Sequence, residues 1–396
     1  MKELSRIASA VQASTTMAID AMFKQMKADG VDVIGFGAGE PDFNTPDNIK
    51  AAGIAAIEQN ITRYTPAAGT VELRQAVCGR MKADYGLEYK PSQVVVSSGA
   101  KHLVYLALRA VVNPGDEVIL PAPYWVSYIE LIKMVGGVPV VVTATEAEHF
   151  KLTAEKLSAA ITPRTKAILL NNPSNPTGMM YDREELEAIA AVCTQADIYV
   201  ISDEIYACLA YDGRTFTSFA SLSADAKERT ILVNGVSKAY AMTGWRMGFA
   251  CGPREVIAVM TKLHQNCIMC APTTSQYAAV VAMRECDDEI ERMRQEYDMR
   301  RRFLVSRLNE MGLSCFEPKG AFYVFPSIQS TGLSSDEFCE RLLYAKRVAV
   351  VPGTAFGDSG EGFVRISYAY SVSHLKQALD RIESFLQQLR EEGVNG

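Results

Sequence analysis

The stretch TILVNGVSKAYAMTGWR, residues Thr230 to Arg246, begins with a short apolar run and places a lysine soon after it. Apolar runs of similar length recur upstream, and helical patterns such as DREELEAIAAVC lie between some of them. The upstream runs are VVVS (Val94–Ser97), EVILP (Glu117–Pro121), VPVVV (Val138–Val142), AILL (Ala167–Leu170) and IYVIS (Ile198–Ser202). Because the runs are continuously apolar rather than alternating, they predict strands that are covered on both faces. The alternation predicts an α/β domain with a mostly parallel sheet covered by helices.

The last part of the chain has a different pattern. A long charged segment, DDEIERMRQEYDMRRRFLVSRL (Asp287–Leu308), is helical in its spacing, and the strand candidates GAFYVF, AVVPG and FVRISYA follow it. The closing stretch SHLKQALDRIESFLQQLREE (Ser373–Glu392) repeats leucine and isoleucine at helical spacing, so one of its faces belongs to a core. We predict a second, smaller α+β domain here. Pattern alone does not assign the first residues to either domain.

The chain has 396 residues, of which 48% are hydrophobic, and this length suggests two domains with a large core. Its net charge of −6 gives no support to nucleic-acid binding, and no apolar run approaches the ~18 residues of a membrane helix. The N-terminus shows no apolar signal-peptide segment, so we expect a cytoplasmic protein. The nine cysteines are then expected to be reduced, and Cys267 and Cys270 lack the further ligands of a zinc site, so no metal is expected.

Chemically distinctive residues follow the predicted strands, and in an open α/β sheet ligands bind beyond the carboxyl ends of the strands. The residues in these places are Gly99, Ala100 and Lys101, then Tyr124 and Trp125, Asn175, Asp203 and Tyr206, and finally Ser237, Lys238 and Arg246. Taken alone, an aromatic residue after a strand is usually packing, and a lone aspartate is usually a helix cap. Together they offer a phosphate cradle, an aromatic plane, an amide, a carboxylate and an amine, which is the set that pyridoxal 5′-phosphate needs.

Several motifs identify a family. NPSNPTG, SDEIY and SKAYAMTGWRMGF, in this order and spacing, resemble the class I aminotransferases of the aspartate aminotransferase fold type. The resemblance extends over nearly the whole chain through GAGEPDF, RYTPAAGTVELRQAV, PYWVSY and VPGTAFG, and it is closest to the bacterial aspartate aminotransferases. It implies a small domain built from both chain ends, residues 1–45 and 285–396, and a large cofactor-binding domain over residues 46–284. It also implies a homodimer whose active sites are shared across the interface.

The same resemblance implies a role for each cofactor-binding residue. Lys238 would bind pyridoxal phosphate covalently and later move a proton, and Asp203 would pair with the ring nitrogen. Tyr206 and Asn175 would bond the ring oxygen, and Trp125 would stack on the ring. Lys238, Asp203 and Tyr206 make up the expected catalytic set. The phosphate would be held by Gly99, Ala100, Lys101, Ser237 and Arg246, and by Tyr64 of the neighbouring subunit.

Other positions would bind the substrate. Arg365 would clamp the α-carboxylate with help from the backbone of Gly39, and Lys101 is in the place of the cation that binds a side-chain carboxylate in the closest relatives. The remaining contacts would come from Trp125, Asn175, Ser14 and Thr16. We therefore predict transfer of the amino group of L-aspartate to 2-oxoglutarate, giving oxaloacetate and L-glutamate, in a ping-pong reaction through pyridoxamine phosphate. Aromatic amino acids or prephenate as substrates, and C–S lyase chemistry, are the alternatives.

Two further sequence patterns are similar to motifs of other protein classes. GVSKA (Gly235–Ala239) nearly matches the G-x-S-x-G turn of a serine hydrolase with Ser237 as nucleophile, but its last glycine is missing and only His264 and His374 follow as bases. GFGAGEPD, at residues 35–42, does not keep the G-x-G-x-x-G spacing of a dinucleotide site. The pyridoxal-phosphate enzyme is therefore the favoured interpretation.

Overall fold

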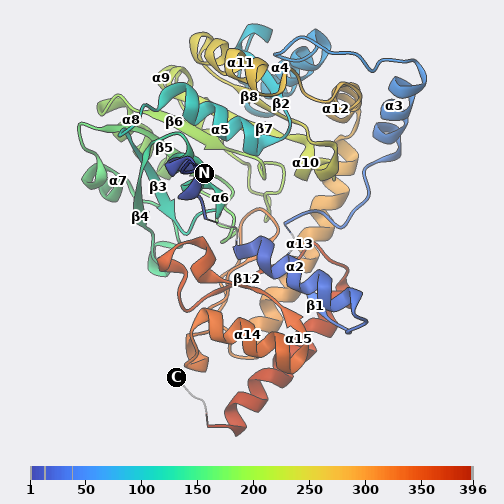
Figure 1. The fold of residues 1–396 in the computed structure, drawn as a ribbon. Coiled ribbons are helices and arrows are strands. Elements are labelled where there is room, and N and C mark those ends of the chain that lie inside the picture. Colours follow the sequence, from blue (N-terminus) through green and yellow to red (C-terminus); the bar gives the residue numbers. More distant parts are fainter. Residues whose placement is uncertain (1, 13–14, 38, 394–396) are drawn as a thin grey trace.

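A seven-stranded sheet forms the centre of the larger of two domains, in the upper part of Figure 1. This computed structural model describes residues 2–12, 15–37 and 39–393, and for residues 15–20 the backbone only. The strands lie in the order β2-β8-β7-β6-β5-β3-β4. Their bounds are β2 Val94–Ser97, β3 Glu117–Ala122, β4 Val138–Thr143, β5 Thr165–Asn171, β6 Tyr199–Asp203, β7 Thr230–Gly235 and β8 Gly248–Cys251.

The pairing of the strands confirms the mostly parallel sheet, because β3 to β7 run in one direction. β8 is antiparallel to both of its neighbours, β2 and β7, and the sequence patterns do not predict it. Because β8 is antiparallel to both β7 and β2, β2 runs in the same direction as β7. The carboxyl ends of β2 and β7 therefore lie at the same edge of the sheet. This brings Gly99, after β2, and Arg246, just before β8, to the edge where Lys238 follows β7.

Helices cover both faces of the sheet, which explains the continuously apolar strands. The helices of this domain are α3 Asp47–Glu58, α4 Val71–Tyr85, α5 Ala100–Val111, α6 Ser127–Met134, α7 Ala154–Ala160, α8 Arg183–Gln195, α9 Ala224–Arg229, α10 Val236–Ala239, α11 Arg254–Ile268 and α12 Thr273–Glu285. Ile231 and Val233 of β7 share a buried cluster with side chains of α5, α6 and α11. Leu232, between them, packs in a different cluster with α4 and α12. Successive residues of one strand therefore face different helix layers.

β4 is the exception to this rule. It lies at the edge of the sheet, where Val138 and Val141 are 45% and 44% exposed. The expectation that VPVVV is covered on both faces is therefore wrong. The physical reason is that a short run of valines has the same pattern at an edge as in the centre of a sheet.

The smaller domain lies below the sheet in Figure 1 and combines the two ends of the chain. Its elements are β1 Ile34–Gly35, β9 Tyr323–Val324, β10 Val348–Ala349, β11 Val351–Pro352, β12 Val364–Ser367, α2 Thr15–Ala28, α13 Asp287–Glu310, α14 Ser335–Lys346 and α15 Val372–Glu391. β1 pairs in parallel with β10, and β11-β12-β9 form an antiparallel sheet. α13 and α15 correspond to the helices predicted from the charged segment and from the closing segment.

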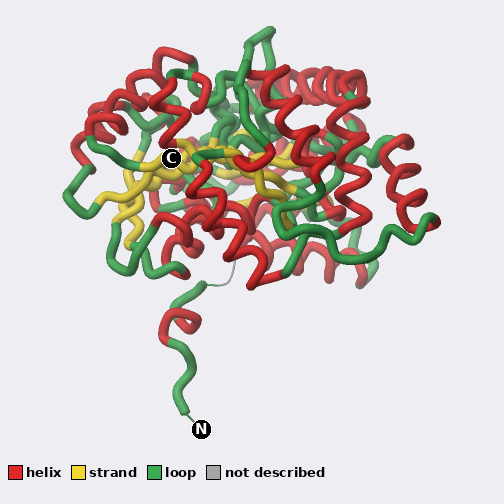
Figure 2. The backbone as a smooth tube through the Cα atoms, turned by 90° about the horizontal axis from the view of Figure 1, so that it is seen from above, coloured by secondary structure: helices red, strands yellow, loops and turns green. Residues whose placement is uncertain are grey.

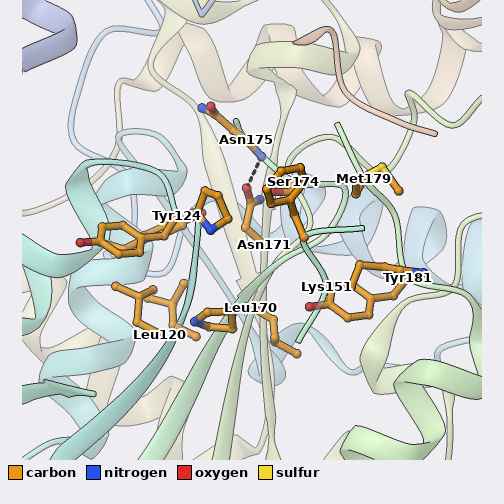
Figure 3. Close-up of a pocket in the computed structure, with 14 residues that line it drawn as sticks. Leu120, Tyr124, Lys151, Leu170, Asn171, Ser174, Asn175, Met179 and Tyr181 are labelled. Atoms are coloured by element: carbon orange, nitrogen blue, oxygen red, sulfur yellow. Dashed lines mark hydrogen bonds between the residues drawn. The ribbon is translucent and has the colours of Figure 1, made fainter. Parts of the chain in front are cut away.

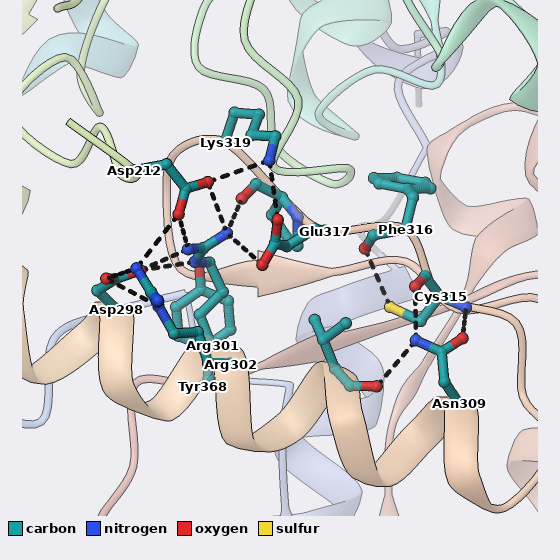
Figure 4. A network of polar contacts seen from close by, with 12 residues as sticks. Asp212, Asp298, Arg301, Arg302, Asn309, Cys315, Phe316, Glu317, Lys319 and Tyr368 are labelled. Carbon is teal, nitrogen blue, oxygen red and sulfur yellow. Dashed lines mark hydrogen bonds and ion pairs between the residues drawn. The ribbon is translucent and has the colours of Figure 1, made fainter. Parts of the chain in front are cut away.

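An ion-pair network, shown in Figure 4, joins the loop after β6 to the smaller domain. Arg301 of α13 is fully buried, and its guanidinium lies 2.6 Å from a carboxylate oxygen of Asp212 and 2.6 Å from one of Asp298. Lys319 approaches the other Asp212 oxygen at 3.0 Å, and its backbone oxygen accepts a hydrogen bond of 3.1 Å from the backbone nitrogen of Tyr211. The network therefore holds the segment that leads into β9 against the larger domain.

The first described residues form α1 (Arg6–Ser9), and Figure 2 shows them extending away from the rest of the molecule. The backbone nitrogen of Gln12 donates a hydrogen bond of 3.0 Å to Glu130 Oε2 of α6. None of the helices in the described parts of the chain combines the length and the apolar character needed to span a bilayer.

Candidate active site

A cavity of about 630 Å³ lies at the carboxyl ends of the sheet strands and is lined by residues of both domains. Of the residues predicted from the sequence, it brings together Gly39, Ala100, Lys101, Trp125, Asn175, Asp203, Tyr206, Ser237, Lys238, Arg246 and Arg365. These residues are spread over most of the chain, so only the fold gathers them.

Lys238 lies in α10, which begins directly where β7 ends. Its Nζ donates a hydrogen bond to the carbonyl oxygen of Gly39. The pKa of Lys238 is lowered to about 8, mainly because the amine is buried, and the carboxylate of Glu40 opposes this shift. Such an amine gives up its proton much more readily than an ordinary lysine, so it can act as a nucleophile and as a base near neutral pH.

Asp203 ends β6, and its carboxyl group is buried. The hydroxyl of Tyr128 donates a hydrogen bond of 2.7 Å to Oδ2, and the backbone nitrogen of Ile205 donates one of 3.2 Å to Oδ1. Burial raises the pKa of Asp203 to about 6, and both hydrogen bonds act in the opposite direction. Both of these hydrogen-bond donors are uncharged. Because a buried carboxylate is stabilised by a positively charged partner, Asp203 suits a cationic atom of a ligand.

Asn175 lies in the loop after β5, which contains cis bonds before Pro173 and Pro176. Figure 3 shows the backbone nitrogen of Asn175 held by Asn171 Oδ1, at 2.8 Å, with the Asn175 side chain pointing away from Asn171. The amide oxygen of that side chain accepts a hydrogen bond of 2.9 Å from Nη1 of Arg365. The loop therefore places an amide against the guanidinium of the other domain.

Arg365 of β12 is a buried cation. Its Nη2 donates a hydrogen bond of 2.7 Å to the backbone oxygen of Gly37, and its guanidinium carbon lies 4.6 Å from the ring centroid of Tyr323. Burial lowers the pKa of Arg365, and the described residues give its buried Nε no hydrogen-bond partner. A buried guanidinium with an unused donor suits the carboxylate of a ligand, because a carboxylate supplies both the charge and the acceptors.

The start of α5 and the side chain of Arg246 form a cradle for an anion. Gly99 has a φ of +90°, which favours glycine, and a Cβ at this residue would displace the Arg246 guanidinium, since it would lie 2.4 Å from Nη2. Arg246 Nη2 donates a hydrogen bond of 3.3 Å to the backbone oxygen of Ser98. The helix itself begins at Ala100, and the amides of a helix N-terminus favour negative charge. The cradle therefore fits a phosphate group, with Ser237 buried at the same edge.

Trp125 and Lys101 form a second pair at the cavity. The Lys101 amine lies 4.7 Å from the centroid of the Trp125 ring. The Trp125 ring meets the ring of Tyr128 at 83°, with the centroids 5.2 Å apart. Burial lowers the pKa of Lys101, and the charge of Arg246 lowers it further. A cation held over an aromatic face can bind a second anionic group in the cavity.

Tyr128, Tyr323 and Tyr370 line the cavity but are absent from the sequence-based site. Tyr128 bonds Asp203 as described above, and the hydroxyl of Tyr323 lies 2.9 Å from the hydroxyl of Tyr206. Tyr128 belongs to the motif PYWVSY, which supports the family resemblance, and Tyr323 belongs to the strand candidate GAFYVF. The signal was therefore present in the sequence, but no role was attached to these side chains.

Some predicted site residues do not line this cavity. Gly99 lies one residue before the lining residue Ala100, and Tyr64, before α4, is 83% exposed. Ser14 lies outside the described residues, and Thr16 lies in α2, where its side chain is not described. The roles of Ser14, Thr16 and Tyr64 stay predictions.

The geometry gives no support to the serine hydrolase alternative. His264 Nδ1 lies 2.8 Å from the backbone oxygen of Ala67, and His374 stacks on Tyr370 with the ring centroids 5.0 Å apart. Both histidines that follow Ser237 are therefore engaged elsewhere.

Within the described ranges, no three His, Cys, Asp or Glu side chains gather as a metal site would require.

Comparison with known families places the chain among the aminotransferases. The family described as aminotransferase class I and II matches residues 31–382. The chain belongs to this family. It is 46% identical over 393 residues to an aspartate aminotransferase of Bacillus sp. strain YM-2, covering 98% of this chain and 100% of the relative.

Two further comparisons extend this relationship. An aspartate/prephenate aminotransferase of Cereibacter sphaeroides is 45% identical over 397 residues, covering 97% and 99% of the two chains. The solved structure of the aspartate aminotransferase from Rhizobium meliloti has a TM-score of 0.93 at 40% identity, covering 98% of this chain and 99% of that chain. The similarity therefore includes the whole fold as well as the motifs.

Class I aminotransferases depend on pyridoxal 5′-phosphate, and the residues of this chain fit that cofactor. A protonated ring nitrogen would supply a cationic partner for the buried carboxyl of Asp203. Arg246 and the start of α5 match a phosphate, and the Lys238 amine is easily made neutral, as covalent binding of an aldehyde requires.

Proposed function

We propose that this aminotransferase moves the amino group of L-aspartate to 2-oxoglutarate, giving oxaloacetate and L-glutamate. The observation that carries the proposal is a pair of cations on one cavity, the buried guanidinium of Arg365 and the Lys101 amine over Trp125. A planar guanidinium suits the α-carboxylate, because it can donate two parallel hydrogen bonds to it. Lys101 then remains for the second carboxylate, which aspartate and glutamate have and most amino acids lack.

In this proposal Lys238 is the base of the reaction. It would hold the cofactor covalently, and its amine, once free, would remove the proton from the α-carbon of the substrate. When bound, pyridoxal phosphate supplies a ring that withdraws electrons from this carbon. The lowered pKa of Lys238 suits this task, because an amine that stayed protonated could not accept the proton.

The other residues hold and orient the reacting groups. The Asp203 carboxylate would keep the ring nitrogen protonated, and Trp125 would stack on the ring. Tyr206 and Asn175 would donate hydrogen bonds to the ring oxygen, while Arg365 would fix the substrate by its α-carboxylate. Because Arg365 already touches Asn175, carboxylate binding and cofactor binding share one set of contacts.

The test compares kcat/KM for aspartate and for phenylalanine in matched lysine variants. Lys101→Ala is expected to lower the value for aspartate about 10- to 100-fold, since a charged hydrogen bond contributes about 1.5–3 kcal/mol. The value for phenylalanine is expected to change much less. Lys166→Ala is the control, because its amine lies 5.7 Å from the ring centroid of Tyr199, outside the cavity lining. This control is expected to leave both values unchanged.

Equal losses for the two substrates in Lys101→Ala would contradict the recognition of a dicarboxylate. A parent enzyme that prefers phenylalanine as donor, or prephenate as acceptor, would point to the alternative substrates. Release of pyruvate and ammonia from a sulfur amino acid would point to a lyase. Activity retained by Lys238→Ala at the parent rate would contradict the mechanism itself.

We also infer that the working unit is a homodimer. Exposed apolar side chains occur on α3, α4 and α12, where α3 and α4 both pack on α12, and at the point where α11 ends; α3 and α12 are at the upper right of Figure 1. This apolar face consists of Ile54, Ile57, Tyr64, Val71, Ile268, Met269 and Tyr277. A second copy of the chain would remove these side chains from water and would bring the exposed Tyr64 towards the phosphate of its neighbour, as the resemblance implies.

A further inference from the structure

The segment that carries Tyr64 has an exposed side chain but a well-held backbone. It joins α3 to α4, and the Tyr64 side chain is 83% exposed. Just before Tyr64, the hydroxyl of Thr273 donates a hydrogen bond of 2.7 Å to the backbone oxygen of Arg63. Just after it, the side-chain amide of Gln276 donates one of 2.8 Å to the hydroxyl of Thr65. Two side chains of α12 therefore fix the segment on both sides of a phenol that points away from the chain.

A buried histidine of α11 holds the same segment at a third point. His264 is fully buried, and its Nδ1 lies 2.8 Å from the backbone oxygen of Ala67. Because a carbonyl oxygen can only accept, Nδ1 donates its proton to Ala67. The other ring nitrogen, Nε2, is buried and has no hydrogen-bond partner among the described residues. A phenylalanine would fill this space without an unpaired nitrogen, so the bond to Ala67 is what the histidine adds.

His264 also lies close to the anion cradle of its own chain. Its ring centroid is 5.7 Å from that of His102, which lies in α5. His102 Nδ1 is in turn 2.7 Å from the hydroxyl of Ser97, the last residue of β2, and the cradle residue Gly99 follows two positions later. The pair of histidines therefore lies between the cradle and the segment of Tyr64.

The helices that hold this segment also carry part of the apolar face. Ile268 ends α11, Met269 follows it, and Tyr277 lies in α12, and all three are exposed. Tyr64 is not among the described residues that line the cavity of its own chain. A second copy seated on the apolar face would therefore meet the Tyr64 phenol, while the groups that hold its segment lie beneath it.

We propose that His264 is a positioning residue for the cofactor site of the neighbouring subunit. By holding Ala67, it fixes residues 63–69 so that Tyr64 meets the phosphate of the neighbour in one orientation. The inference rests on the proposed homodimer and on the role proposed there for Tyr64. His264 is not among the described residues of the cavity lining, so it acts only through the segment. The cofactor affinity of one subunit then depends on a histidine of the other.

The experiment uses hybrid dimers, purified from two copies of the full chain that carry different tags. One copy carries Lys238→Ala and cannot bind pyridoxal phosphate covalently, so the absorbance of the covalently bound cofactor reports the other copy alone. In the first hybrid, His264→Phe is placed in the Lys238→Ala copy. In the second hybrid, it is placed in the copy that keeps Lys238. A third hybrid without His264→Phe is the reference.

The two placements of His264→Phe are expected to give different affinities. The first hybrid should bind pyridoxal phosphate with a dissociation constant about fivefold above the reference, as for one lost hydrogen bond. The second hybrid should match the reference, because its reporting site meets Tyr64 from a copy with an intact His264. An unchanged first hybrid, or a larger loss in the second hybrid than in the first, would overturn the proposal.

Two further variants of the first hybrid separate the lost hydrogen bond from a change in packing. His264→Asn places an amide nitrogen where Nδ1 lies, so it should restore most of the affinity although the side chain is smaller. Tyr64→Phe with His264→Phe should bind no more weakly than Tyr64→Phe alone, because the effect of His264 passes through Tyr64. An asparagine variant that binds as weakly as the phenylalanine variant, or additive losses in the double variant, would contradict the role of His264.

A failure of the proposed function would give other results. A parent protein that gains no visible absorbance with pyridoxal phosphate would refute the aminotransferase assignment and the role of His264 with it. A reference hybrid whose affinity ignores Tyr64→Phe in the Lys238→Ala copy would refute the shared site. A hybrid that responds to Tyr64→Phe in that copy, but not to His264→Phe, would refute the role of His264 alone.

Discussion

At the scale of single residues, the hydrogen bond from Tyr128 to Asp203 is expected to control how the apoenzyme binds its cofactor. Burial raises the pKa of Asp203 to about 6, and the bond from Tyr128 opposes this shift. In Tyr128→Phe the pKa rises further, so the carboxyl group stays protonated to a higher pH. A protonated carboxyl cannot pair with a cationic ring nitrogen. The acid limb of pyridoxal-phosphate affinity should therefore move to higher pH by about one unit, since 1.36 kcal/mol corresponds to one pH unit.

The measurement is the apparent dissociation constant of pyridoxal phosphate for the apoenzyme between pH 5 and pH 8. Tyr181→Phe is a matched control, because the Tyr181 hydroxyl is also buried but accepts a hydrogen bond from the backbone of Leu152. Its affinity profile should match the parent profile. A Tyr128→Phe profile that does not move would show that the Tyr128 hydroxyl has no influence on the charge of Asp203.

The sequence could predict residues whose position follows directly from a strand end. Asp203 and Lys238 lie at or just after β6 and β7, so the rule for parallel sheets places them at the correct edge. Tyr128 and Tyr323 could not be placed in this way, because their importance comes from contacts with residues far away in the sequence. Tyr323 meets Tyr206 only after the smaller domain has folded against the larger one. The catalytic and binding roles themselves stay predictions.

At the scale of elements, two neighbouring arginines of α13 are expected to differ strongly in their effect on stability. Arg301 is fully buried between Asp212 and Asp298, whereas the Arg302 side chain is 60% exposed and contacts the same two carboxylates. Arg301→Met should destabilise the protein by about 3 kcal/mol, because it removes the only fully buried cation that Asp212 and Asp298 share and leaves them the more exposed Arg302 and Lys319. Arg302→Met should cost less than about 1 kcal/mol, since exposed ion pairs contribute little.

Urea denaturation, followed by fluorescence or circular dichroism, measures both variants under the same conditions. Similar midpoints for the two variants would show that burial does not distinguish these ion pairs. Activity provides an independent check, because the network leads into the segment of Tyr323 and a loosened segment should lower kcat as well.

Some strands can be predicted from the sequence and others cannot. The apolar runs predict β2 to β7 to within a few residues, because strands between two helix layers must be apolar throughout. β8 was missed because its four residues, GFAC at Gly248–Cys251, include no β-branched side chain, whereas β2, which is equally short, reads VVVS. The surroundings of β4 were predicted wrongly, because position in the sheet depends on pairing and not on local pattern. In the smaller domain the strand candidates GAFYVF, AVVPG and FVRISYA contain β9, β11 and β12, whereas β1 and the start of β10 were not predicted.

At the scale of the whole molecule, the apolar face is expected to hold two copies together. Met269 of this face is 46% exposed, and Val138 at the far edge of the sheet is 45% exposed, so the two positions form a matched pair. Met269→Asp should shift the protein from dimer to monomer, because it places a charge in an apolar interface. Val138→Asp should leave the dimer intact. Sedimentation velocity over a range of protein concentrations measures the distribution.

Loss of the dimer should also lower the affinity for pyridoxal phosphate, if Tyr64 reaches the phosphate of the neighbouring copy. Dimers that persist in Met269→Asp but dissociate in Val138→Asp would place the interface on the β4 edge instead.

The division of the chain into domains at residues 45 and 284 stays a prediction. Limited proteolysis, with the fragments identified by mass, can locate the boundaries.

The pairing of β1 with β10 has a consequence for how the protein is made. Ile34 leaves the ribosome about 300 residues before its partner Val348, which corresponds to roughly 15–60 s of translation at 5–20 residues per second. All seven strands of the larger domain are encoded between Ile34 and Val348. They have therefore all been synthesised before β1 can pair with β10. We therefore expect the seven-stranded domain to fold before β1 and β10 pair.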